Sequence, residues 1–180
     1  MHQPRFKITP RLLDYISSAA ELKAEISSGV IDVAWLPRLQ GETAARLAHS
    51  STAIEGNPLT LPDVQALARG EEIGAPSKAR QEVLNYLAAM RWIWGGKPEE
   101  AVGERGLLHL HKLLTRGILP PEKCGRYKTQ PNRVVDPHGR TVYAPPGPKE
   151  ARALTRELLA WINAHENASL HPIIVGAIAH

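Results

Sequence analysis

At 180 residues, the chain is long enough for one domain with a hydrophobic core, or for one domain with an appended subdomain. Its hydrophobic fraction of 43% is ordinary, and no window approaches the roughly 18 uninterrupted apolar residues of a membrane-spanning helix. No apolar run follows the basic N-terminal residues, so a secretory signal is not expected. A single cysteine, Cys124, excludes an intramolecular disulfide, and together these features predict a cytoplasmic protein.

The formal net charge of +4 makes nucleic acid a partner class to consider. The basic excess lies in the stretch from Glu104 to Arg133, and its basic residues are Arg105, Lys112, Arg116, Lys123, Arg126, Lys128 and Arg133. Such a stretch is consistent with a phosphate-binding surface and equally with a solvated surface. Because no recognition-helix or aromatic stacking pattern accompanies the charge, nucleic-acid binding is disfavoured.

The first predicted helix begins at Thr9-Pro10, since threonine caps helices and proline is tolerated in the first turn. An apolar stripe follows and ends before Gly29; its members are Leu12, Leu13, Ile16, Ala19, Ala20 and Ile26. The short apolar segment 30–36 is closed by Pro37, which predicts a packed connector rather than a strand.

A second helix is predicted from Thr43, because Ala44, Leu47, Ala48, Ser51 and Ile54 recur at intervals of three and four. Gly56, Asn57 and Pro58 then end it. Glu55 would therefore lie in the last helical turn, where an anion costs a few tenths of a kcal/mol unless a cation offsets it. Glu55 is consistent with a solvated surface residue or with a residue that awaits a cationic partner.

The next helix is predicted to begin after Thr60, with Pro62 in its first turn and Asp63 complementing the helix dipole, and to end at Gly70. The clearest apolar stripe of the chain follows; it comprises Val83, Leu87, Met90, Ile93 and Trp94. A further helix is expected at about 105–116, closed by Gly117. His109 and His111 on this helix face different directions, so a shared metal ion is not expected.

The amino-acid composition changes at Ile118, after which prolines and glycines exclude a long helix. The segment 132–143 predicts a β-hairpin, because Asp136–Gly139 suits a type I turn. Its strand residues are Val134, Val135, Val142 and Tyr143. An isolated hairpin is marginally stable, so this one should lie on a helical body or receive a partner strand.

Two helices are predicted after the hairpin. The first is marked by Leu154, Leu158, Trp161 and Ile162. The second begins at Pro172, after the flanking residue His171, and is apolar on nearly every side up to His180 without a stop signal. This pattern predicts a central helix and a chain that ends within an element.

The segment Ser51–Thr60, which reads STAIEGNPLT, resembles the inhibitory-helix motif of Fic-domain (filamentation induced by cAMP) proteins: Ser or Thr, three residues, Glu, then Gly or Asn. The resemblance extends from about residue 40 to the end, through 80–86, 107–117, 125–128, the hairpin and 171–180. It implies a mainly α fold, a Fic-like helical bundle with one β-hairpin, C-terminally incomplete. Residues 1–100 would form an N-terminal helical region with the inhibitory helix at about 43–56, and 101–180 the first part of a Fic-like core with its flap at about 132–143.

The resemblance implies transfer of AMP from ATP, with Mg²⁺, to a Ser, Thr or Tyr hydroxyl of a protein. Ser51, Glu55 and Gly56 would form the inhibitory motif, with Glu55 pairing the second arginine of the catalytic motif. Val134, Val135, Val142 and Tyr143 would form a flap that docks the target by adding a strand.

The defining motif of that family, His-Pro-Phe-x-x-Gly-Asn-Gly-Arg and a further arginine, does not occur in these 180 residues; Ile-Ile-Val-Gly-Ala follows His171-Pro172. We therefore assign no catalytic residue and no metal ligand, and expect the chain alone to be inactive and to bind neither ATP nor Mg²⁺ tightly. Alternatives are a stand-alone binding or inhibitory module and, ranked lower, a basic helical nucleic-acid-binding domain. A homo-oligomer stays open, and no membrane association is expected.

Overall fold

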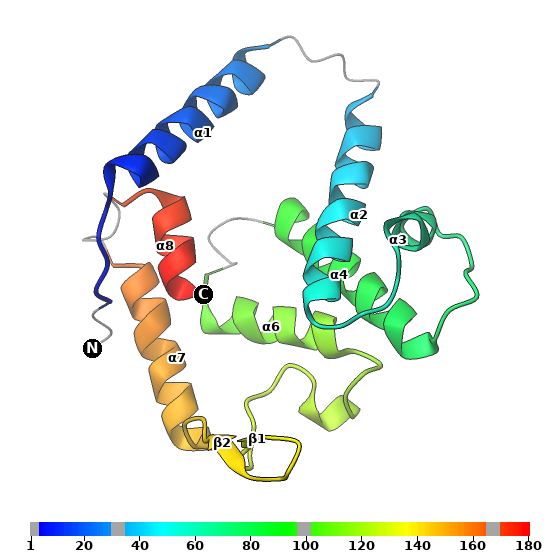
Figure 1. Ribbon diagram of the computed structural model, residues 1–180, viewed down its shortest axis with the longest axis vertical. Helices are drawn as coiled ribbons and strands as arrows, with labels where there is room; N and C mark the ends of the chain where they lie inside the picture. The colour runs from blue at the N-terminus through cyan, green and yellow to red at the C-terminus, as the bar shows by residue number, and fades with distance from the viewer. Residues whose placement is uncertain (1–3, 30–34, 97–101, 165–169) are drawn as a thin grey trace. The chain divides into compact units, whose positions relative to one another are not determined.

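The computed structural model describes residues 4–29, 35–96, 102–164 and 170–180, and it confirms the mainly α fold with one small hairpin (Figure 1). The chain divides into two compact units, Pro37–Arg152 and Met1–Leu36 with Ala153–His180, and each of the two boundaries falls within a helix. The expected boundary between residues 100 and 101 lies outside the described residues.

In the unit formed by the chain ends, α1 (Pro10–Ser28) begins and ends where the sequence predicts. The Thr9 hydroxyl accepts a hydrogen bond from the backbone N–H of Leu12 at 3.2 Å, which satisfies one free donor of the first turn. No residue of α1 is buried, so much of its apolar stripe is exposed. The expected connector at 30–36 lies mostly outside the described residues.

The same unit contains most of α7 (Pro148–Ile162) and all of α8 (Pro172–Ala179). His171 caps α8, since its Nδ1 accepts from the backbone N–H of Ile173 at 3.3 Å. Ile174 is buried while Ile173 is exposed, so the helix buries only part of its apolar surface within the described residues. Among the described residues, no helix is long and apolar enough to cross a membrane.

The core of the other unit is built by α2 (Leu36–Ile54), α3 (Leu61–Ala68) and α4 (Ser77–Gly95) (Figure 1). α2 begins earlier than predicted, because Pro37 is a first-turn residue of the helix and not the end of the connector. The buried residues of this core come from all three helices and from the segment before α3: Ala45, Ala48, Leu59, Val64, Leu67, Ala79, Val83 and Leu87.

α6 (Glu104–Thr115) packs against α4, and the side chain of Asn85 connects them. Its Nδ2 donates to the carbonyl oxygens of Leu114 at 3.0 Å and Arg116 at 2.7 Å, so it satisfies two carbonyls at the end of α6. A short 3₁₀ helix, η1 (Pro121–Lys123), and the hairpin follow.

The hairpin consists of β1 (Val134–Val135) and β2 (Thr141–Tyr143), paired antiparallel with Val134 opposite Tyr143. A β-bulge shifts the register between Val134 and Val135, because Val135 lies opposite Thr141 while Val134 lies opposite Tyr143. Gly139 has φ of +78°, and its N–H donates to the Asp136 carbonyl at 2.9 Å.

Candidate functional site

The C-terminus of α2 is closed by a Schellman motif that presents Glu55. Gly56 has φ of +85°, a conformation that costs other L-residues about 1–2 kcal/mol. The Gly56 N–H donates to the Ala53 carbonyl at 2.9 Å, and the Asn57 N–H donates to the Thr52 carbonyl at 3.0 Å. Glu55 is thus the residue between the last helical position and a turn whose hydrogen bonds are fully formed.

Asn57 fastens this turn to α4. The residue is 8% exposed, and its side-chain Oδ1 accepts from the backbone N–H of Leu59 at 3.1 Å. Its Nδ2 donates to the Ala79 carbonyl at 3.0 Å and to Glu82 Oε2 at 2.8 Å. Both amide hydrogens therefore have acceptors, and the buried side chain fixes where the chain leaves α2.

A second connection to α4 lies one helical turn before Glu55. The hydroxyl of Ser51 donates to the hydroxyl oxygen of Tyr86 at 2.8 Å in a partly buried position. The Tyr86 ring packs against the buried core. The sequence shows no signal for these α4 partners, because they are 35 and 25 residues from Ser51 and Asn57.

Glu55 itself is exposed, and its carboxylate makes no hydrogen bond or ion pair with any described residue. The neighbouring Ile54 is 83% exposed. A carboxylate at the negative end of a helix dipole is mildly destabilising, and here no described cation offsets it. An arginine guanidinium is the group that such a carboxylate binds most strongly, through paired charge-assisted hydrogen bonds.

The hairpin turn is held by Asp136. Its Oδ1 accepts from the backbone N–H groups of His138 and Arg140, both at 2.9 Å, and its Oδ2 pairs with the Arg140 guanidinium at 2.8 Å. The backbone N–H of Arg140 is the largest cause of a lowered pKa for Asp136. Both strands are exposed along their length, and in the described part of the chain they pair only with each other.

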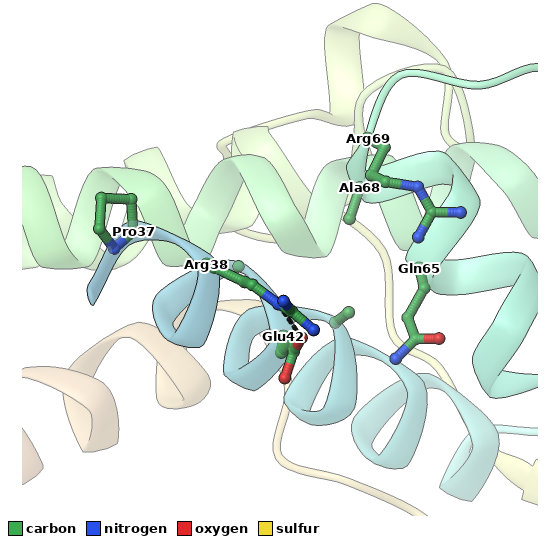
Figure 2. A pocket seen from close by; sticks show the side chains of 8 residues that line it. Pro37, Arg38, Glu42, Gln65, Ala68 and Arg69 are labelled. Atoms are coloured by element: carbon green, nitrogen blue, oxygen red, sulfur yellow. Dashed lines mark hydrogen bonds and ion pairs between the residues drawn. The ribbon is translucent and has the colours of Figure 1, made fainter. Parts of the chain in front are cut away.

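Two open hollows lie in the unit 37–152. One, of about 530 Å³, lies between α2 and α3; Figure 2 shows Arg38 paired with Glu42 on one side and Gln65 and Arg69 on the other. The other, of about 1190 Å³, is lined by α4 and α6 residues and by Arg152. Neither Glu55 nor the flap strands border either hollow, so these two hollows do not bring the candidate residues together.

The two histidines of α6 and the cysteine have local structural partners. His111 Nδ1 accepts from the backbone N–H of Gly125 at 2.9 Å, and the His109 ring lies 4.9 Å from that of Trp92. The Cys124 thiol lies 3.5 Å from the Thr115 carbonyl oxygen. Within the described residues, no three histidine, cysteine or acidic side chains lie where they could hold a metal ion.

Comparison with known proteins gives a consistent result, although no family model matches the chain. The protein adenylyltransferase Fic of Drosophila virilis is 28% identical over 149 residues, which is 81% of this chain and 29% of that protein. The protein of the same name from Culex quinquefasciatus is 25% identical over 184 residues, and the matched region covers 100% of this chain and 33% of that protein.

Solved structures agree in fold. A Fic family protein from Desulfovibrio desulfuricans G20 matches with a TM-score of 0.81 and 28% identity over 99% of this chain and 52% of that one. A Fic domain containing signaling protein from Bacteroides thetaiotaomicron matches in fold with a TM-score of 0.73 over 89% of this chain. The chain spans about half of the first structure and about a third or less of these curated relatives. In sequence and fold the chain is therefore similar to Fic family proteins, and the curated relatives it matches are protein adenylyltransferases.

Proposed function

We propose that this chain supplies the inhibitory helix of a Fic-type AMP-transferase, with Glu55 as the restraining group. The observation that carries the proposal is the exposed Glu55 carboxylate, which has no described partner although the turn beneath it is fully hydrogen-bonded. In AMP transfer a protein hydroxyl attacks the α-phosphate of ATP and pyrophosphate leaves. An arginine paired with Glu55 is unavailable to the γ-phosphate, so ATP is not held in the reactive orientation.

The hairpin is proposed to bind the target protein. Its exposed strands can receive an extended segment by main-chain hydrogen bonding, and such a segment would supply the partner that a two-stranded hairpin lacks. Mg²⁺ would accompany ATP in the family reaction. The described residues offer no set of metal ligands, so Mg²⁺ is not assigned to this chain.

An inhibition assay in trans tests the role of Glu55. A Fic-type AMP-transferase whose own inhibitory glutamate is replaced by glycine is titrated with this chain, and transfer from ATP labelled at the α-phosphate is measured. We expect inhibition, and we expect Glu55→Gln to raise the half-inhibition concentration about tenfold or more, since hydrogen bonds to charged groups contribute about 1.5–3 kcal/mol. Glu72→Gln, which removes an equal charge from another exposed position, is the control.

Equal inhibition by the chain and its Glu55→Gln variant would contradict the proposed role. A separate incubation of the chain with labelled ATP, without the transferase, tests the expectation that it is inactive alone. Label that appears on the chain or on an added protein would refute that expectation.

A further inference from the structure

We infer that α4 positions Glu55 through a two-point clamp in which Tyr86 and Asn57 are the positioning residues. This inference rests on the proposed function of Glu55. One point of the clamp is the Ser51–Tyr86 hydrogen bond of 2.8 Å, and the other is the Asn57 amide on the Ala79 carbonyl and Glu82. Ser51 precedes Glu55 by one helical turn and Asn57 follows it closely, so the two points bracket the carboxylate.

The partners on α4 belong to one face of the helix. Ala79, Glu82 and Tyr86 follow the i, i+3, i+7 spacing that aligns side chains along a helix. Val83, which lies beside them in this row, is fully buried in the core. Both points of the clamp therefore lie on a helix that is packed into the buried core, and rotation of the end of α2 would break both of them.

Consecutive residues of α4 hold two different helices. Tyr86 holds α2, while Asn85 donates to the Leu114 and Arg116 carbonyls and accepts from Gln81 Nε2 at 2.8 Å. The position of Glu55 is thereby tied to the C-terminus of α6. Because α4 contacts both the end of α2 and the end of α6, it fixes the position of the Glu55 carboxylate relative to α6.

The clamp predicts that Tyr86→Phe, which removes only the hydroxyl, loosens the turn. One lost hydrogen bond contributes about 1 kcal/mol, so amide hydrogen exchange at Gly56 and Asn57 should accelerate about fivefold. In the trans assay the half-inhibition concentration should rise by a similar factor, because less of the chain holds the carboxylate in place. Ser51→Ala should act alike, Ser51→Thr should restore the wild-type values, and Tyr15→Phe in exposed α1 is the control.

Unchanged exchange in both Tyr86→Phe and Ser51→Ala would overturn the clamp. Faster exchange with unchanged inhibition would show a merely structural contact and would overturn the positioning role. If Glu55→Gln leaves inhibition intact, the proposed function of Glu55 fails, and with it the positioning role; the exchange rates then still decide whether Tyr86 holds the turn.

Discussion

Replacing Asn57 with alanine should destabilise the unit 37–152 strongly. The substitution removes three hydrogen bonds, to Leu59, Ala79 and Glu82, and leaves the buried Leu59 N–H without its acceptor. Two neutral bonds contribute about 1 kcal/mol each and the carboxylate bond about 1.5–3 kcal/mol. Glu82 is 31% exposed and lies 3.8 Å from Lys78, so part of its loss is recovered in solvent. The expected loss in the free energy of unfolding is about 2–4 kcal/mol.

Urea unfolding followed by far-UV circular dichroism measures this loss. With a slope of about 2 kcal/mol per molar urea, the midpoint should fall by about 1–2 M. Asn132→Ala is the matched control, because Asn132 is exposed and its side chain contacts the partly exposed Lys128; its effect should stay within about 0.5 kcal/mol. A change of less than about 0.5 kcal/mol for Asn57→Ala would refute the view that this amide anchors the end of α2.

Two further predictions concern turns. Gly56→Ala should lower the free energy of unfolding by about 1–2 kcal/mol through its φ of +85° alone, since no atom lies within 4 Å of the added Cβ. Gly74→Ala, which has equal space and no positive φ, should be nearly neutral in the same urea experiment, and equal effects of the two substitutions would be inconsistent with this cause. The Arg140 N–H lowers the pKa of Asp136 in the folded hairpin, so the carboxylate stabilises the turn above the unfolded pKa of about 4 and this contribution is lost as the pH falls through the lower folded value. The NMR shift of the Asp136 carboxyl carbon should therefore stay constant between about pH 5 and 8 and move only in stronger acid; movement near neutral pH would contradict the lowered pKa of Asp136.

The parts of the fold that local chemistry decides are visible in the sequence. Thr9 and Thr60 cap helices as predicted, and Thr60 and Asp63 form a reciprocal capping box. The turn at Asp136–Gly139 follows from its own residues in the same way. The start of α2 was misplaced because proline marks both the end of a connector and the first turn of a helix.

The parts that depend on distant contacts were not predictable. Tyr86 and Glu82 carry no pattern that distinguishes them from other residues of α4, and their roles follow only from where the end of α2 meets that helix. The apolar stripe on α1 is a local pattern that was readable although its packing was not. Its helical period was readable, but periodicity does not reveal what covers an apolar face, and α1 buries no residue.

The freedom of the Glu55 side chain separates what a mutation does to folding from what it does to regulation. Ser51, Gly56 and Asn57 are constrained by hydrogen bonds or by backbone conformation, so substitutions at these positions lower the free energy of unfolding. Position 55 carries no such constraint, because its side chain contributes no described contact. On the proposed function, selection can therefore strengthen, weaken or abolish the inhibition of AMP transfer by changing this single side chain while the protein keeps its fold. The strength of the inhibition can thus evolve without a cost in stability.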